Sequence, residues 1–225
     1  MSSEPAGKLL VFEGAEGVGK STQLRRLGAA LSAAGRPVLA LREPGGTPLG
    51  DDVRRLLLDP DGDVTPAAEA LLFMASRAQL VERLLRPALA DGVVVLLDRF
   101  FLSTYAYQVA GRGLPAEQVR AANRLATGDL VPDLTLVLSL PAGEGLRRAA
   151  RRGAADRLES AEESFHTRVV GAFEEALGAA WQRSYPECGP IVGIDATGTE
   201  DEVAARVTTA LADRWPETFA PSGVS

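Results

Sequence analysis

Five short apolar runs recur along the chain and predict β-strands. They are KLLVFE from Lys8, VLALRE from Val38, VVVLLD from Val93, LTLVLSL from Leu134 and IVGID from Ile191. Apolar and polar residues do not alternate within these runs, which is typical of strands buried on both faces, as in a parallel sheet. We therefore expect a five-stranded parallel sheet with both faces of its strands covered.

The segments between these runs have the periodicity of helices. Leucine and alanine recur at helical spacing in TQLRRLGAALSAAG, where Gly35 is a natural stop, and in PAAEALLFMASRAQLVERLLRPALADG. Strands that alternate with helices predict an α/β fold in which helices flank both faces of the sheet. Ligands of such folds bind beyond the carboxyl ends of the strands, so the residues that follow each run are the first candidates for function.

The composition favours one domain and limits its partners. The 225 residues, 46% of them hydrophobic, are enough for a single domain with a sizeable core, and we expect the folded part to span about residues 7–215. A formal net charge of −6 argues against broad binding to nucleic acid or to a membrane surface. No apolar run approaches the ~20 residues that cross a bilayer. The single cysteine, Cys188, and the lack of a secretory signal pattern predict a cytoplasmic location.

A phosphate-loop pattern follows the first apolar run. The residues GAEGVGKS match G-x-x-x-x-G-K-[ST] between a predicted strand and a predicted helix. Glycines let backbone N–H groups turn around a phosphate, the lysine reaches the outer phosphates and the serine can ligate Mg²⁺. The alternative is a turn that only joins strand to helix. The predicted ATP-binding residues are Gly14, Ala15, Glu16, Gly17, Val18, Gly19, Lys20, Ser21 and Thr22.

Three further stretches carry candidate chemistry. REPGGT, with Arg42 and Pro44, follows the second run, although its glycines also suit a tight turn. Asp98 ends the third run and Arg99 follows it; the pair could hold Mg²⁺ through water and grip a phosphate, or only form a salt bridge. The last stretch, LRRAARRGAADRLE, concentrates arginine in an otherwise acidic protein, which also fits a solvated helix face.

In combination, these stretches resemble the thymidylate kinase family from about Leu9 to Thr197. The resemblance implies a P-loop nucleoside monophosphate kinase fold with an arginine-rich lid at about residues 147–159. It also implies transfer of the γ-phosphoryl group of ATP to dTMP, with Mg²⁺ as cofactor, and a homodimer. Two alternatives stay open: a kinase for dUMP or for a broader set of deoxynucleoside monophosphates, and a nucleotide-dependent switch, which needs no second nucleotide pocket.

The resemblance assigns a dTMP site to residues on several predicted elements. Phe73 would stack on thymine and Arg77, one helical turn later, would hydrogen-bond a ring carbonyl; without the other motifs, they would read as a core side chain and a solvated charge. Glu13 would lie near the 3′-hydroxyl of the sugar, and Tyr107 would crowd its 2′ position. The full expected set is Glu13, Arg42, Pro44, Phe73, Arg77, Arg99, Ser103, Thr104, Tyr107 and Gln108.

Glu16 within the phosphate loop directs attention to the lid. In the family, enzymes with a non-basic residue at this loop position take their catalytic arginine from the lid, which implies Arg152 here, with Arg148 and Arg157 as further ATP contacts. The adenine is expected near Ala196, after the fifth run. The expected catalytic residues are Lys20, Arg99 and Arg152, and the expected metal contacts are Ser21 and Asp98.

Overall fold

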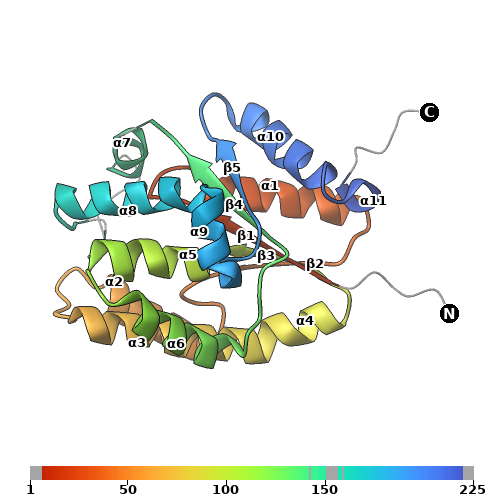
Figure 1. Ribbon diagram of the computed structural model, residues 1–225. Helices are drawn as coiled ribbons and strands as arrows, with labels where there is room; N and C mark the ends of the chain where they lie inside the picture. The colour runs from red at the N-terminus through yellow and green to blue at the C-terminus, as the bar shows by residue number, and fades with distance from the viewer. Residues whose placement is uncertain (1–6, 142, 151–156, 159, 220–225) are drawn as a thin grey trace.

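The chain folds around a five-stranded parallel sheet (Figure 1). The computed structural model describes residues 7–141, 143–150, 157–158 and 160–219. The strands are β1 (Lys8–Glu13), β2 (Val38–Arg42), β3 (Val94–Asp98), β4 (Leu134–Ser139) and β5 (Ile191–Asp195). They lie in the order β2-β3-β1-β4-β5, and all neighbours are parallel, which confirms the sheet predicted from the apolar runs.

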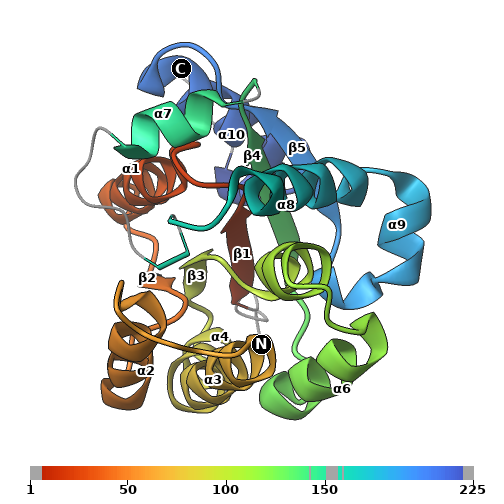
Figure 2. The same cartoon turned by 90° about the vertical axis from the view of Figure 1, so that its left-hand side faces the viewer.

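Helices connect the strands and cover both faces of the sheet (Figures 1 and 2). They are α1 (Lys20–Ala33), α2 (Pro48–Leu58), α3 (Pro66–Leu80), α4 (Arg86–Ala90), α5 (Phe101–Thr104), α6 (Ala116–Thr127), α7 (Glu144–Ala150), α8 (Glu163–Ala176), α9 (Ala179–Ser184), α10 (Glu200–Ala212) and α11 (Pro216–Phe219). Stretches of π-helix join α3 to α4 (Val81–Leu85) and extend α5 (Tyr105–Gly111), and a 3₁₀ turn covers Pro186–Cys188. Among the described residues, no helix has both the length and the apolar composition needed to cross a lipid bilayer.

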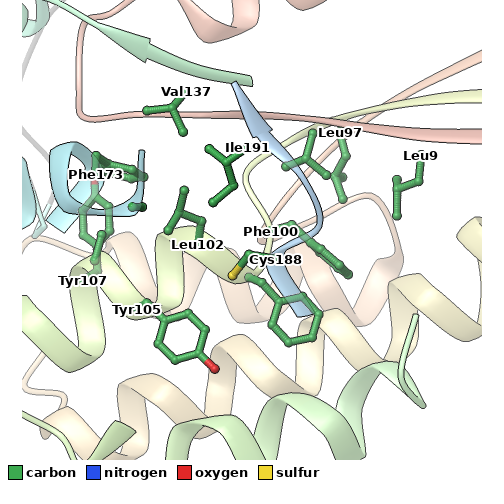
Figure 3. Close-up of a cluster of buried hydrophobic side chains, with 14 of the residues drawn as sticks. Leu9, Leu97, Phe100, Leu102, Tyr105, Tyr107, Val137, Phe173, Cys188 and Ile191 are labelled. Atoms are coloured by element: carbon green, nitrogen blue, oxygen red, sulfur yellow. The ribbon is translucent and has the colours of Figure 1, made fainter. Parts of the chain in front are cut away.

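Successive residues of a strand face opposite sides of the sheet, which divides the apolar core into two clusters. On one side, Leu10 and Phe12 of β1 pack with α1 and α10. On the other side, Leu9 belongs to the cluster in Figure 3, which also contains residues of α5 and α8. There the rings of Tyr107 and Phe173 lie 6.3 Å apart, edge to face. Because both sides are apolar, the strands show no alternation in the sequence.

The two edge strands depart from this pattern. No residue of β2 is fully buried, and in β5 Val192 and Gly193 are exposed. Each of these strands has a hydrogen-bonded neighbour on one side only, so its outer flank lacks the side chains that would cover it. The prediction that both faces of every strand are buried was therefore wrong at the edges.

The folded region also continues past the limit expected near residue 215. Helix α11 buries Phe219, whose ring centroid lies 5.9 Å from that of Trp215. Phe219 belongs to the same core cluster as α1 and α10, so the chain contributes to the core at least as far as this residue.

Candidate active site

The phosphate loop joins β1 to α1 at the carboxyl edge of the sheet. Gly14, Gly17 and Gly19 have φ angles of 131°, 73° and 96°, in the region that favours glycine. A Cβ at Gly14 would also lie 2.4 Å from the carbonyl oxygen of Leu138, so a side chain has no room there. The loop pattern thus specifies a curled backbone rather than a simple connection between strand and helix.

Lys20 is the first residue of α1, and its side chain folds back into this loop. Its Nζ donates to the carbonyl oxygens of Gly14 at 3.0 Å and Ala15 at 2.7 Å. Burial and the nearby Arg99 guanidinium lower the pKa of Lys20 to about 8, although neighbouring carboxylates oppose the shift. A phosphate that replaced the two carbonyl oxygens would stabilise the charged ammonium, so the site is suited to an anionic ligand.

Asp98 contacts the start of α1, and Arg99 contacts the phosphate loop. Ser21 Oγ donates to Asp98 Oδ2 at 2.5 Å. Arg99 Nη1 donates to the carbonyl oxygen of Gly14 at 3.1 Å and to Ser103 Oγ at 2.9 Å. The φ angle of Arg99 is 72°, which is uncommon for a residue other than glycine and turns its side chain back over the loop.

Glu16 connects the loop to two helical segments. Its carboxylate accepts a hydrogen bond from the Tyr107 hydroxyl, lies 3.7 Å from Arg99 Nη2 and lies 3.9 Å from Nδ1 of His166 on α8. Burial raises the pKa of Glu16, but Arg99, the Tyr107 hydrogen bond and Lys20 outweigh it and hold the pKa below its usual value. No local pattern in the sequence indicates that Glu16 and Tyr107 meet, because they are 91 residues apart.

Arg77 is 1% exposed, which rules out a solvated charge. Its Nε donates to Glu43 Oε2 at 2.8 Å, and its Nη1 donates to Thr104 Oγ1 at 3.0 Å and to Asn123 Oδ1. Its Nη2 donates to the carbonyl oxygen of Phe100 at 3.0 Å and lies 2.6 Å from Glu43 Oε2. Burial raises the pKa of Glu43, against the opposing effect of Arg77. All five guanidinium N–H groups thus face protein acceptors, so a hydrogen bond to a base would require one partner to be exchanged.

One cavity extends from the phosphate loop to α3 and collects most of the predicted residues. They are Glu16, Gly17, Gly19, Lys20, Ser21, Thr22, Arg42, Pro44, Phe73, Arg77, Asp98, Arg99, Ser103, Thr104, Tyr107 and Gln108. Phe73 is half-buried on this wall, so it is not a fully buried core residue.

Four lining residues were missed by the sequence analysis: Glu43, Arg54, Leu58 and Leu158. Arg54 of α2 donates from Nη1 to the carbonyl oxygen of Pro44 at 3.2 Å, and both Arg54 and Arg42 line the cavity. An arginine inside an amphipathic helix resembles any solvated charge in sequence. Only the packing of α2 shows that this one faces the cavity.

Glu13 is held by the start of α5. It is fully buried and does not line the cavity. Its carboxylate accepts hydrogen bonds from the backbone N–H groups of Phe100 at 2.8 Å and Ser103 at 3.0 Å, and from Ser103 Oγ at 2.6 Å. The start of α5 exposes unpaired N–H groups, and Glu13 satisfies those of Phe100 and Ser103. Its expected contact with a sugar hydroxyl stays a prediction.

The three arginines assigned to the lid have different surroundings. Arg148 of α7 lines a second pocket with Gly17 and Ala196, where the adenine was expected (Figure 2 shows α7 above α1). Arg157 lies near α2 and α3 instead, where it contacts Glu69. The expected contact of Arg157 with ATP stays a prediction. Arg152 lies outside the described residues.

Ser21 and Asp98 fit the Mg²⁺ that accompanies ATP in phosphate-loop enzymes. Among the described residues, no group of three or more His, Cys, Asp or Glu side chains could hold a metal by itself. Ser21 Oγ and Asp98 Oδ2 are both oxygen donors beside Lys20. Mg²⁺ prefers oxygen and is commonly held by one or two protein groups together with substrate phosphates.

The chain is similar to thymidylate kinases in sequence and in structure. The family model for thymidylate kinase matches residues 12–183. The thymidylate kinase of Deinococcus radiodurans is 49% identical over 208 residues, which cover 92% of this chain and 98% of that protein. That of a Synechococcus strain is 47% identical over 207 residues, which cover 92% and 95%. The crystal structure of thymidylate kinase from Ehrlichia chaffeensis superposes with a TM-score of 0.72 and 27% identity, covering 92% of this chain and 100% of that chain.

Proposed function

The chain belongs to the thymidylate kinase family, and on that premise we propose that it transfers the γ-phosphoryl group of ATP to dTMP, giving dTDP and ADP. One observation carries the proposal: a single cavity has the phosphate loop with Lys20 on one side and Phe73 and Arg77 on the other, with Asp98 and Arg99 also on its wall. This arrangement suits two nucleotides whose phosphates meet. A nucleotide-dependent switch would need only the phosphate-loop side.

The reaction needs no protein nucleophile, because the attacking oxygen of dTMP is already anionic. Catalysis then depends on holding the phosphates in line and on neutralising their charge. We assign these tasks to Lys20, which would exchange its two carbonyl partners for ATP phosphates, and to Arg99, which spans the loop and Ser103. Arg152 stays a prediction as the lid cation.

Ser21 and Asp98 would hold the Mg²⁺, supported by their contact at 2.5 Å beside the loop. When bound, the ion supplies positive charge that lowers the repulsion between the phosphates. Arg148, on the wall of the second pocket, would lie beside the adenine-bearing part of ATP.

At the other end of the cavity, we propose that Thr104 recognises the base by a hydrogen bond. Arg77 donates to Thr104 Oγ1, which leaves the hydroxyl hydrogen free to donate to a ring carbonyl. Phe73 would stack on the ring, and Gln108 would add a polar contact at the wall. Arg77 therefore acts on the base at least in part through Thr104, in addition to any direct contact.

The phosphate and sugar of dTMP would lie between these groups. Arg42 and Arg54 line the same cavity and could bind the 5′-phosphate above Pro44. Tyr107 is held in place by Glu16 and by Arg99, whose guanidinium carbon lies 4.9 Å from the ring centroid. A ring fixed in this way would exclude a 2′-hydroxyl.

The test is a coupled assay of ADP release with MgATP and a panel of monophosphates. We expect turnover that depends on dTMP, and poor turnover of dCMP, whose exocyclic amine would oppose a donor with a donor. Comparable rates with dTMP and dUMP would identify a kinase of broader specificity. ADP release that no monophosphate stimulates would favour the switch.

We also propose that the protein is a homodimer that associates through α2, α3 and α6. Leu56, Leu71 and Leu125, one on each helix, are 59%, 64% and 88% exposed, and the three helices pack next to one another (Figure 2). Exposed leucines gathered on one layer are typical of a surface that a partner covers. Light scattering should show a dimer that Leu125→Glu dissociates and Val192→Glu, at the sheet edge, does not. A monomeric wild-type protein would contradict the proposal.

A single kinase domain and a cytoplasmic location complete the proposal. One sheet takes its strands from Lys8 to Asp195, which supports a single domain. Consumption of ATP and a buried free cysteine, Cys188, support a reducing compartment that supplies ATP.

A further inference from the structure

Glu69 is a buried carboxylate outside the nucleotide cavity that collects donors from distant parts of the chain. It lies in the first turn of α3 and is fully buried. Gln108 Nε2 donates to its Oε1 at 2.9 Å, and Arg157 Nη2 donates to its Oε2 at 2.7 Å. Arg112 donates to both oxygens, from Nε at 3.2 Å and from Nη2 at 3.1 Å. Burial raises the pKa of Glu69, but these donors outweigh it and lower the pKa, so the carboxylate is charged.

Two of these donors, Gln108 and Arg157, belong to different parts of the site. Gln108 lines the nucleotide cavity directly. Arg157 ends the arginine-rich stretch, and the next residue, Leu158, is buried on the cavity wall. The same carboxylate therefore accepts hydrogen bonds from a residue that lines the cavity and from the last arginine of the arginine-rich stretch.

Further contacts with the end of α2 hold Arg157 in place beside Glu69. Its Nε donates to the carbonyl oxygen of Leu57 at 2.9 Å, and its backbone N–H contacts that of Leu58 at 3.5 Å, both at the end of α2. Its side chain is 11% exposed in the pair with Glu69. These partners all belong to α2 and α3, on the opposite side of the cavity from the phosphate loop.

We propose that Glu69 and Arg157 are positioning residues that fix the end of the arginine-rich segment to the dTMP side of the cavity. The inference rests on the proposed kinase function, for which that segment supplies the lid. Arg157 acts on the reaction through Glu69 and not by contact with ATP phosphates. A charge-assisted hydrogen bond of this kind fixes both the distance and the orientation between its two partners, and catalysis by positioning requires both.

A double-mutant cycle on kcat tests this dependence. Arg157→Met removes one donor but leaves Glu69 with Arg112 and Gln108, so the variant should fold. Misplacement of a catalytic segment lowers kcat by roughly tenfold to hundredfold, and we expect such a loss for Arg157→Met with little change in the KM for dTMP. Glu69→Gln should lower kcat similarly and also raise the KM for dTMP, because Gln108 loses a charged acceptor. The double variant should be no slower than the slower single variant, since both break one connection.

Two variants serve as controls. Arg112→Met removes another donor from the same carboxylate, and its kcat should stay within about twofold of wild type. Arg157→Lys should recover part of the lost kcat, because an ammonium group can still pair with Glu69.

The inference is overturned if Arg157→Met lowers kcat by the same factor in the Glu69→Gln background as in wild type, since Arg157 would then act independently, as a phosphate ligand does. It is also overturned if Arg112→Met is as slow as Arg157→Met. Thermal unfolding of the same variants separates this failure from failure of the proposed function. If wild type shows no dTMP-dependent turnover but the melting temperatures are non-additive for Glu69 and Arg157, the function is wrong and the pair stands.

Discussion

Gly17 and Gly145 pack backbone against backbone, so that the tip of the phosphate loop rests on the first turn of α7. A Cβ built on Gly17 would lie 1.9 Å from the carbonyl oxygen of Gly145, and one built on Gly145 would lie 2.4 Å from the carbonyl oxygen of Glu16. Backbone atoms cannot yield by rotating a side chain. The two missing side chains therefore set the distance between the loop and the helix that carries Arg148.

The first prediction follows from this contact. Gly145→Ala should push α7 away from the phosphate loop and raise the KM for ATP by roughly tenfold, with little effect on the KM for dTMP. Steady-state kinetics with each substrate varied in turn would measure the change. Gly171→Ala on α8 is the matched control, because a Cβ there meets no heavy atom within 4 Å. It should stabilise the helix by about 0.5–1 kcal/mol and leave both KM values unchanged. If Gly145→Ala had the same KM for ATP as the wild-type protein, the contact between Gly17 and Gly145 would have no role in ATP binding.

Lys20 predicts proton uptake when nucleotide binds. Burial, followed by Arg99, holds its pKa at about 8 in the free protein, whereas ATP phosphates would raise it. At pH 8.5 a lysine of pKa about 8 is mostly neutral, so binding should take up roughly 0.7 proton per nucleotide. Calorimetry in buffers of different ionisation enthalpy would measure the uptake, which Lys20→Met should abolish. Equal uptake in the variant would assign the proton to another group.

The lowered pKa of Lys20 also predicts how the stability of the protein changes with pH. The usual pKa of lysine is 10.5, so between about pH 8 and 10.5 the unfolded chain binds more protons than the native state. The cost of a buried ammonium is fully present below pH 8 and is relieved as the pH rises. Without nucleotide, Lys20→Met should therefore be more stable than wild type at pH 7, and the difference in unfolding free energy should shrink toward pH 10. If the difference in unfolding free energy between Lys20→Met and wild type grew with pH, burial of the charged ammonium would not be its cause.

The packing of the Tyr107 ring predicts how two variants differ in sugar discrimination. Tyr107→Phe keeps the ring against Arg99 and Phe173, so the preference for dTMP over its ribonucleotide analogue should change little. Tyr107→Ala opens the space beside the sugar, and the preference should fall by at least about tenfold. The ratio of kcat/KM for the two substrates measures both. Equal preference in wild type and Tyr107→Ala would remove Tyr107 from the sugar pocket.

Thr104 offers a cleaner test of base recognition than Arg77. Arg77→Ala would leave Glu43 buried without its cation, a loss of about 3–5 kcal/mol in stability, so weak activity would be ambiguous. Thr104→Val keeps the shape and the remaining partners of Arg77, and we expect a rise in the KM for dTMP on the order of tenfold with the KM for ATP unchanged. Thr127→Val is a matched control, because the Thr127 hydroxyl is buried and donates to the carbonyl oxygen of Asn123 outside the cavity. Equal KM values for dTMP in the two variants would exclude Thr104 from base recognition.

Local patterns were enough to predict the parallel sheet and the phosphate loop. The apolar runs predicted all five strands, because a strand in a parallel sheet covered by helices is a nearly continuous run of apolar residues. Gly14, Gly19 and Lys20 lie within one short segment, so the phosphate-loop pattern can be recognised without the fold. Phe73 and Arg77 occupy one helix, and their spacing alone placed them together.

Packing between distant segments decided the rest. Which strands are exposed depends on the strand order, which follows from how the connections cross and not from any single run. Glu13 ends a strand as a candidate ligand would, yet the start of α5 takes its carboxylate. Arg157 and Glu69 are 88 residues apart, and an arginine in sequence looks the same whether water or a buried carboxylate surrounds it. The partners of a charge, unlike its position in a helix or strand, exist only once the helices have packed.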